Sequence, residues 1–471
     1  MIPSLRDRLA TTWVSPAALG THRAHPLGPA DRVLGRVLWP LALLSMLHLV
    51  AFPAATGAVT DDFGTVYRAV GRFLRGEVVY NEAYSQVDPH YLYNPGATLL
   101  LAPLGMPSDL ASARMAFIVV NALAIVAGLA LLTRLSGHRL RGWLLPASVL
   151  AASATEAVRS TLIFSNINGL LFLALAGFLT LLLGGRPGWA GVVLGLAIVV
   201  KPFFAPLLLL PLATARWRAV ASAVALPLAL NATAWPLMNQ PGRYFTVVAP
   251  YLGEVRDYSN PSLAGQAVYF GMPGLLHGAL ACYFYGCVLV GVVALLRWRY
   301  SDAYLWAITT SSVLLAGVFL LSSLGQKYYS LLLFPLFFTA TQERGVARQP
   351  LVWVAAYLCF TPLGFPSPSW HTEYVLSTLT ATLGWALLLC VVAGSAIGWW
   401  RDEPRAPSPR RPAPDGTSQS PRTRHTRRSA RRGLNPHRGN NRRAARVMKN
   451  RTIPQTPIKE HNRDGFQAHQ R

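Results

Sequence analysis

The chain has 471 residues, of which 52% are hydrophobic and only 13% are charged, with a mean hydropathy of +0.34 and a formal net charge of +24. Soluble globular proteins carry about 25% charged residues, so this composition excludes an ordinary soluble enzyme and predicts a polytopic membrane protein. The four cysteines lie in apolar stretches and form no Cys-x-x-Cys pair, which excludes a disulfide scaffold or a zinc module: Cys282, Cys287, Cys359 and Cys390.

Apolar segments that could cross a bilayer recur along the chain. A membrane core needs about 20 apolar residues in a helix, and the sequence predicts an all-α fold with about ten spans. The segments are 37–54, 112–133, 143–160, 167–184, 217–237, 274–296, 303–322, 328–341, 350–362 and 374–399. A further apolar block, 188–213, is interrupted by Lys201-Pro202 and by Pro206. Because proline stops a helix, this block predicts a re-entrant or broken-helix hairpin.

Arginine residues indicate the orientation of the chain. The N-terminal arm, residues 1–36, is rich in Arg, so the positive-inside rule places it in the cytoplasm. Counting crossings from there puts every basic connector on the same side, provided that 188–213 enters and leaves the membrane by one face. The membrane domain is then 37–400, followed by a basic cytoplasmic tail, 401–471.

The tail holds 19 Lys and Arg against 5 Asp and Glu and almost no aliphatic runs. Such a segment cannot bury enough apolar surface to fold and should be disordered. Attraction to anionic lipid and binding of nucleic acid are two functional interpretations. A solvated tail that fixes the topology is favoured, and we expect no nucleic-acid partner.

The outer face receives a different set of side chains. It gets a first loop, 55–110, a second large loop, 238–272, and three short connections. The short connections carry Asn166 and Asn168, then Lys201, and finally Gln326-Lys327-Tyr328. Polar groups from five connections therefore meet at one membrane face, which predicts a site at the lipid–water boundary.

The first outer loop contains Asp61 and Asp62 directly ahead of an amphipathic pattern. Apolar residues at helical spacing oppose arginines, which is typical of a short helix lying on a membrane surface: Val66, Val70, Phe73 and Leu74 against Arg68, Arg72 and Arg75. An aspartate at a helix N-terminus is often only a cap, and capping accounts for one of the pair. The other carboxylate predicts a general base.

The segment 88–105 leads from this loop back to the membrane, and Pro89 and Pro95 make it a structured turn. It offers side chains suited to hydrogen bonding or stacking against a sugar: His90, Tyr91, Tyr93 and Asn94. Each tyrosine taken singly is equally well explained as an aromatic anchor at the bilayer boundary.

Two charged positions inside apolar segments, Lys201 and Glu156, are candidates because a charge there is costly unless it faces a cavity or a partner. Lys201 could simply snorkel to the surface, but the adjacent helix break favours a cavity, and phosphate is a natural partner for such a point charge. Glu156 either serves a site or pairs with Arg159. In the second loop, a local salt bridge competes with hydroxyl or phosphate binding by three consecutive residues, Arg256, Asp257 and Tyr258.

Nucleotide and zinc motifs are absent from the sequence. It contains no P-loop, no Gly-x-Gly-x-x-Gly that opens a helix, and no His-Glu-x-x-His. A nucleotide-sugar donor taken from the cytoplasm is therefore disfavoured, and a group donor presented by the membrane itself fits an outer-face site better. We expect no metal ion.

Seven short motifs follow one another along the chain: Thr60-Asp-Asp-Phe, Val87-Asp-Pro-His-Tyr-Leu-Tyr, Asn166-Ile-Asn-Gly, Lys201-Pro, Arg256-Asp-Tyr, Val268-Tyr-Phe-Gly and Gln326-Lys-Tyr-Tyr-Ser. In this order they resemble glycosyltransferase family 87, whose members are multispan GT-C enzymes that use polyprenyl-phosphate sugars. The resemblance covers about residues 30 to 400. It is strongest to the mycobacterial-type group that adds α-(1→3) arabinofuranose branches. Lys327 stands where glycine is expected, which argues against a phosphate role for this lysine.

The resemblance implies inverting transfer of D-arabinofuranose from decaprenyl-phospho-arabinofuranose to O3 of an α-(1→5)-linked arabinan, in cell-wall arabinogalactan or lipoarabinomannan. It implies no cofactor beyond this lipid-linked donor. One carboxylate base is sufficient, and Asp62, directly before Phe63, matches its position better than Asp61. The alternatives are a mannosyltransferase that uses polyprenyl-phosphomannose, and a lipid or solute transporter. Transporters typically contain internal repeats, and the Asp-Asp-Phe loop has no second copy.

Overall fold

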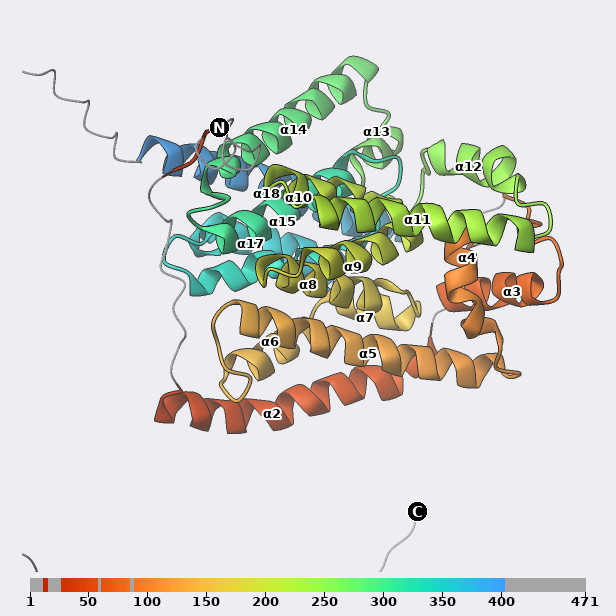
Figure 1. Ribbon diagram of the computed structural model, residues 1–471, viewed down its shortest axis with the longest axis horizontal. Helices are drawn as coiled ribbons and strands as arrows, with labels where there is room; N and C mark the ends of the chain where they lie inside the picture. Colours follow the sequence, from red (N-terminus) through yellow and green to blue (C-terminus); the bar gives the residue numbers. More distant parts are fainter. Residues whose placement is uncertain (1–11, 16–26, 58–60, 85–88, 403–471) are drawn as a thin grey trace, which may run out of the picture. The chain divides into compact units, whose positions relative to one another are not determined.

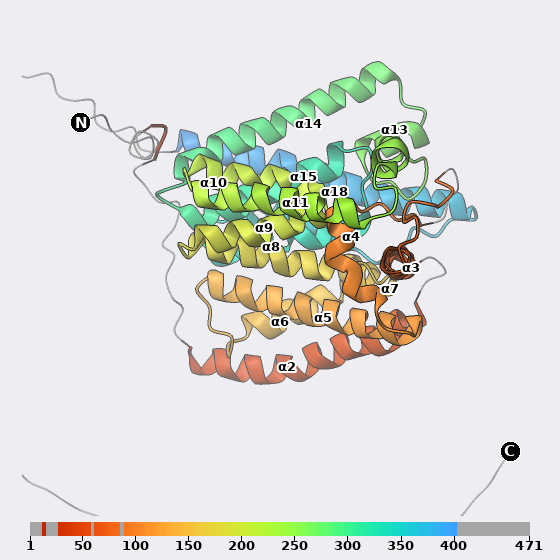
Figure 2. The same cartoon turned by 45° about the vertical axis from the view of Figure 1, so that its right-hand side comes forward.

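The computed structural model describes residues 12–15, 27–57, 61–84 and 89–402. Within these ranges the chain is helical and contains no strand, only an isolated bridge between Val78 and Asn239. The all-α prediction is therefore confirmed for this part of the protein. Helices run side by side through most of the bundle, and the short helices α3 (Asp62–Leu74) and α4 (Pro95–Leu101) lie together at one end of it (Figures 1 and 2). The basic tail, apart from its first two residues, lies outside the described residues.

In the part of the chain that the structure describes, six helical segments are long and apolar enough to cross a membrane. They are Pro29–Ala54, which joins α2 (Pro29–Leu49) to a π-helical turn, then α5 (Leu110–Leu135), α11 (Trp217–Leu237), Gly274–Trp298 with α14 (Gly274–Leu295), α15 (Ala303–Leu321) and Thr372–Arg401 within α18 (Trp370–Arg401). The shorter apolar helices include α6 (Leu144–Ser153), α8 (Asn168–Leu183), α9 (Pro187–Val200) and α17 (Pro350–Phe360).

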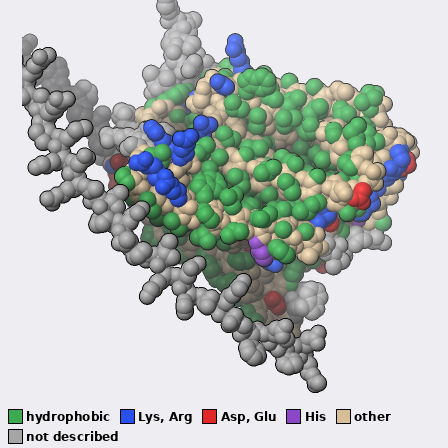
Figure 3. Space-filling view, turned by 90° about the horizontal axis from the view of Figure 1, so that it is seen from below, with side chains coloured by type: hydrophobic (Ala, Val, Ile, Leu, Met, Phe, Trp, Pro, Cys, Tyr) green, Lys and Arg blue, Asp and Glu red, His purple; other side chains and the backbone are tan. Residues whose placement is uncertain are grey.

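The outside of the bundle is apolar, as expected for a protein in lipid. Large hydrophobic side chains are exposed along α2, among them Leu43, Leu44 and Leu47 at 59%, 63% and 62%. Figure 3 shows the face that carries α2 as mostly hydrophobic, with Lys and Arg gathered near one end. Contiguous exposed apolar surface of this kind marks contact with a membrane or a partner, and its continuity over long helices identifies a membrane protein.

The apolar block 188–213 is broken where the sequence predicts. Helix α9 ends at Val200, Lys201 adopts an extended conformation (φ −136°, ψ 102°), and a 3₁₀ turn, η3 (Pro202–Leu208), leads into α10 (Leu209–Ala213). Proline at 202 lacks the N–H that a continued helix requires, and the residue before a proline is pushed out of the helical region. Lys201 is thereby held at a helix end rather than on a helix face.

The amphipathic helix of the first outer loop is present as α3, but its environment differs from the prediction. Its apolar side, including Phe63, Val66 and Val70, is buried against other parts of the protein rather than laid on a membrane surface. The charged side is also partly used inside the fold, because Arg72 binds the Glu82 carboxylate at 2.9 Å. Helix α3 is thus packed into the folded protein rather than lying on its surface.

Other boundaries differ in ways that matter for the site. The predicted span 143–160 is two helices, α6 and α7 (Glu156–Ile163), because Thr155 caps a new helix through its hydroxyl, which accepts from the Val158 N–H. The predicted span 328–341 is largely 3₁₀, built from η6 (Lys327–Leu333), α16 (Phe334–Phe337) and η7 (Phe338–Thr341). Helix α2 starts within the predicted N-terminal arm.

Candidate active site

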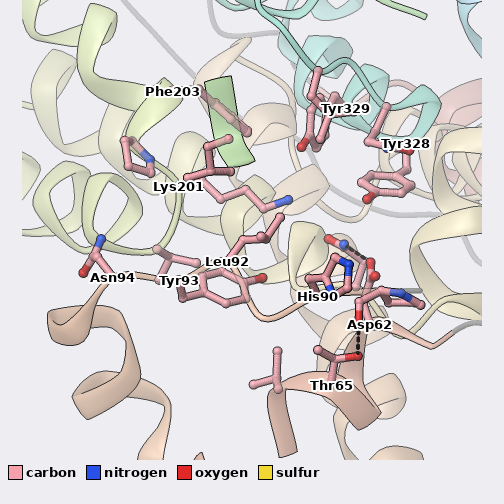
Figure 4. A pocket seen from close by; sticks show the side chains of 18 of the residues that line it. Asp62, Thr65, His90, Leu92, Tyr93, Asn94, Lys201, Phe203, Tyr328 and Tyr329 are labelled. Atoms are coloured by element: carbon pink, nitrogen blue, oxygen red, sulfur yellow. Dashed lines mark hydrogen bonds between the residues drawn. The ribbon is translucent and has the colours of Figure 1, made fainter. Parts of the chain in front are cut away.

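A cavity of about 220 Å³ lies where several of these helix ends meet. Figure 4 shows side chains from α3, the segment before α4, the α9–η3 break and η6 directed into one space. The lining includes Asp62, Thr65, His90, Tyr93, Asn94, Asn166, Lys201, Phe203, Arg256, Gln326, Tyr328 and Tyr329. The structure therefore brings together candidate residues from all five connections that the sequence predicts on one membrane face.

Asp62 is the first residue of α3, and its carboxylate faces the cavity. It accepts a hydrogen bond from the Asn166 side-chain amide, and its own backbone N–H donates to the Phe164 carbonyl at 3.0 Å. Burial raises the pKa of the Asp62 carboxyl above its ordinary value, because a charged group loses its hydration there. The Asn166 hydrogen bond and the charge of Lys201 oppose that rise.

Asp61 is held away from the cavity by structural contacts. One oxygen accepts the Gly64 N–H at 3.1 Å, so Asp61 is the N-cap of α3. The other oxygen is bound by the Arg114 guanidinium, with Ser165 at 3.4 Å. Arg114 also donates to the Ile163 carbonyl at 2.9 Å. Asp61 therefore ties α3 to α5 and α7, and the structure separates the roles of the two aspartates.

Lys201 points into the cavity from the helix break (Figure 4). Its ammonium donates to Asn168 Oδ1 at 3.0 Å and lies 4.7 Å from the ring centroid of Tyr329 and 5.7 Å from that of Tyr328. Aromatic faces attract a cation at such distances. Because Asn166 Oδ1 also accepts the Asn168 N–H at 3.0 Å, the two asparagines connect Asp62 to Lys201.

Polar groups converge on the same space. Figure 4 shows the hydroxyls of Tyr93, Tyr328 and Tyr329 pointing toward the region between Lys201 and Asp62. A carboxylate, an ammonium and three phenols around one small cavity can hold a polyhydroxylated, partly anionic group. The carboxylate can accept a proton while the cation stabilises a departing anion.

Two residues of the 88–105 turn combine structural contacts with the cavity wall. Asn94 caps α4 and donates to the Val199 carbonyl at 2.7 Å. His90 packs against the rings of Tyr84 and Tyr251 with centroids 4.9 and 5.2 Å away. Tyr91 is different: it is fully buried, and its hydroxyl pairs with Thr98 at 2.8 Å. It is not brought into the cavity.

A second cavity of about 510 Å³ adjoins the first, and Asp62, Arg256, Gln326 and Tyr328 line both. Arg256 stacks over the rings of Tyr251 and Tyr258, at 5.2 and 5.9 Å. Glu156 and Tyr258 line only the second cavity and not the first. Asp257 is exposed and lines neither. We name the two spaces the Lys201 chamber and the Glu156 chamber.

Some residues of the site were missed by sequence reasoning. Sequence reasoning could have found Arg114, because it lies inside the predicted span 112–133, where an arginine is costly without a partner. Tyr329 is the second tyrosine of the Gln326-Lys-Tyr-Tyr motif, and only the 3₁₀ geometry of η6 directs both rings to Lys201. Among the residues that the structure describes, no cluster of three or more His, Cys, Asp or Glu could hold a metal ion.

The fold and site define a class: an all-helical membrane protein with a carboxylate and a cation in a cavity at the helix ends, suited to group transfer from a lipid-borne polar substrate. The sequence profile of glycosyltransferase family 87 matches residues 91–323. An α-(1→3)-arabinofuranosyltransferase of Corynebacterium glutamicum is 48% identical over 394 residues, which cover 83% of this chain and 92% of that protein. The chain belongs to glycosyltransferase family 87 and is a membrane glycosyltransferase.

Two further relatives carry the same description. The α-(1→3)-arabinofuranosyltransferase of Mycolicibacterium smegmatis is 40% identical over 390 residues, which cover 81% of this chain and 90% of that protein. The α-(1→3)-arabinofuranosyltransferase of Mycobacterium tuberculosis is 42% identical over 364 residues, or 76% of this chain and 84% of that protein. The similarity therefore extends through most of the membrane domain and is not confined to the site.

Proposed function

We propose that this protein is an inverting arabinofuranosyltransferase that moves D-arabinofuranose from a polyprenyl-phosphate donor, decaprenyl-phospho-arabinofuranose, to O3 of an α-(1→5)-linked arabinan. The product is an α-(1→3) branch in cell-wall arabinogalactan or lipoarabinomannan. The observation that carries the proposal is that the Asp62 carboxylate and the Lys201 ammonium line the same cavity. The names of the three relatives support arabinose over mannose as the transferred sugar.

The reaction needs one base and one anion stabiliser. As O3 of the acceptor attacks C1 of the donor sugar, its proton passes to the Asp62 carboxylate. The O3–C1 bond forms while the C1–O bond to phosphate breaks, and polyprenyl phosphate leaves with the bonding electrons. Burial makes Asp62 a stronger base than an ordinary aspartate, because the raised pKa favours its protonated form. Phosphate leaves as a stable anion, so a second carboxylate acting as an acid is unnecessary.

The donor phosphate is assigned to Lys201, with Arg256 as its second cation. Both residues line the Lys201 chamber. An ammonium inside a restricted space interacts with phosphate much more strongly than in water. His90, Tyr93 and Tyr328 then surround the sugar. Asn166 and Asn168 hold Asp62 and Lys201 in place through the hydrogen bonds that they make with them.

We place the protein in the plasma membrane with both termini in the cytoplasm and the two chambers on the outer face. The proposed topology has ten spans and a hairpin formed by α9, η3 and α10. The Arg-rich connectors support this orientation through the positive-inside rule. A reporter fused after residue 405 should be active only as a cytoplasmic reporter, and export of that fusion would overturn the assignment.

The decisive experiment is product analysis with purified protein. The protein is given decaprenyl-phospho-arabinofuranose and an α-(1→5)-linked arabino-oligosaccharide, and the new linkage is determined by methylation analysis and NMR. An α-(1→3)-linked arabinofuranosyl branch is expected. In a parallel reaction, polyprenyl-phosphomannose replaces the arabinose donor. Transfer of mannose alone would overturn the proposed donor while leaving the family assignment intact.

A further inference from the structure

The two chambers differ in chemistry although they share a wall. The Lys201 chamber contributes aromatic rings and an ammonium, as described above. The Glu156 chamber is lined by carboxylate, amine and hydroxyl groups of four separate segments: Glu156 and Ser160 of α7, Tyr258 and Ser259 of the second outer loop, Lys327 of η6, and Tyr374, Ser377 and Thr378 of α18. Carbohydrate recognition uses many small hydrogen-bonding groups of this kind.

One side of the Glu156 chamber is formed by hydroxyl-bearing residues of α18, and their spacing along the helix places them together. Tyr374, Ser377 and Thr378 are spaced by three and four residues, so they share one face of that helix. The Lys327 ammonium donates to Ser377 Oγ at 3.1 Å, which places the lysine on this side. On α7, the Glu156 carboxylate, which also lines the chamber, accepts a hydrogen bond from the Ser160 hydroxyl. The chamber therefore presents both donors and acceptors toward its interior.

We infer that the Glu156 chamber binds the acceptor glycan, as a run of hydroxylated sugar residues, while the Lys201 chamber binds the donor. This inference rests on the proposed function, and its reason is stereochemical. An inverting displacement brings the nucleophile to the face of the anomeric carbon opposite the leaving group. Acceptor and phosphate must therefore occupy different sides of the transferred sugar, and the base must reach the acceptor side. Asp62 lines both chambers, whereas Lys201 lines only one.

The inference assigns Ser377 and Glu156 to acceptor recognition. It also gives Lys327 a role that the family pattern does not supply: its ammonium donates hydrogen bonds to oxygens of the acceptor glycan. Its position in the Glu156 chamber separates it from Lys201.

The test separates the Michaelis constants of the two substrates. Ser377→Ala removes one hydrogen-bonding group from the Glu156 chamber and should raise KM for the arabino-oligosaccharide about 3- to 10-fold, the effect of one hydrogen bond. KM for the lipid-linked donor should stay unchanged. Ser377→Thr keeps the hydroxyl and should restore most of the acceptor affinity. Glu156→Gln should act in the same direction as Ser377→Ala. Leu383→Ala, at an exposed position of the same helix, is the matched control.

Different outcomes identify different failures. A raised donor KM with an unchanged acceptor KM in Ser377→Ala would place the donor in this chamber and overturn the inference. Unchanged values for both substrates in Ser377→Ala and Glu156→Gln would remove the chamber from recognition. Wild-type protein that transfers no sugar would instead contradict the proposed function. In that case, saturation-transfer NMR of the oligosaccharide with wild type and Ser377→Ala still reports whether the chamber binds glycan.

Discussion

The Glu156 chamber and an apolar groove elsewhere in the bundle have similar volumes, about 510 and 560 Å³, but opposite linings. The groove lies among α5, α6, η7 and α17 and is lined by aromatic and aliphatic side chains such as Trp143, Phe337 and Trp353, with no Asp, Glu, Lys or Arg. The chamber is lined by Asp62, Glu156, Arg256 and Lys327. Volume alone therefore does not mark the site of chemistry in this protein.

The difference has a physical cause. Charged groups in a membrane protein persist only where partners or a polar cavity compensate for lost hydration. Helix ends supply such partners, because their free N–H and C=O groups need capping. Asn94 caps α4 and lines the Lys201 chamber, and Asp61 caps α3 directly before Asp62. One cap, Thr155, lines the groove instead, but no Asp, Glu, Lys or Arg side chain accompanies it there.

The largest effect should come from Asp62→Asn. The amide keeps the size of the side chain but cannot accept the acceptor proton, so turnover should fall 10²–10⁴-fold, as is typical when a general base is lost. Donor binding and thermal stability should be nearly unchanged. Turnover with both substrates, together with a melting curve, measures this. Near-normal turnover would show that Asp62 is not the base. The charged lining would then no longer distinguish the chambers from the groove as the place of the reaction.

Lys201→Gln should weaken binding of the lipid-phosphate donor while leaving acceptor KM unchanged. The neutral amide keeps a hydrogen-bonding group but cannot supply the charge that phosphate requires. Equilibrium binding of polyprenyl phosphate compared with the uncharged polyprenol isolates the phosphate contribution. Equal loss for both ligands, or loss for neither, would contradict the role of Lys201 as the phosphate cation.

The same substitution should also move the pH profile. The base must be ionised, so activity falls as the pH drops through the pKa of Asp62, which burial has raised. Lys201 lowers that pKa through its positive charge, so Lys201→Gln should raise it further and shift the acid limb of kcat to higher pH. Lys201→Arg keeps the positive charge and should leave the acid limb of kcat near its original pH. A shift to lower pH would contradict this coupling.

Asp61→Ala should affect stability more than chemistry. Loss of an N-cap costs about 1 kcal/mol, and Arg114 also loses its carboxylate. Asp61→Asn keeps a good capping residue and should be milder. Unfolding by heat in a fixed detergent, compared with kcat of the folded fraction, separates the two effects. A larger fall in kcat for Asp61→Asn than for Asp62→Asn would transfer the role of base to Asp61.

The smallest effect is expected in the apolar groove. Ala151→Leu adds apolar volume to its lining without introducing charge, and substitutions away from buried or charged features usually change stability by about 0.5 kcal/mol or less. Turnover and both KM values should match wild type. A substantial fall in donor affinity would show that the groove contributes to binding of the lipid chain.

Much of the architecture was predictable from local sequence. The positions of the long apolar helices, the amphipathic helix over 66–74 and the break at Lys201 follow from hydrophobic length, helical spacing and proline. Where the prediction differed, the local signal was ambiguous. Thr155 splits a continuous apolar stretch, and the buried side of α3 faces protein rather than lipid, which amphipathicity alone cannot distinguish.

Many residues of the site were predictable from the sequence, but their geometry was not. Lys201, Asn166 and Tyr328 come from short connections far apart in sequence, yet they meet at one cavity. Tyr91 and Tyr93 are two residues apart and look alike in sequence. One is buried against Thr98, and the other faces the cavity. Only packing against the neighbouring segments decides between them.

By itself, the sequence determined that this is a helical membrane protein with its polar groups gathered at connections, because burial of apolar length and the turn chemistry of proline are local properties. Tertiary structure alone decided which of two adjacent aspartates faces the cavity. Arg114, more than fifty residues away, binds Asp61 and fixes the rotation of α3, so that Asp62 is left to meet Asn166. That choice depends on contacts between distant segments, which helical spacing and capping preference do not encode.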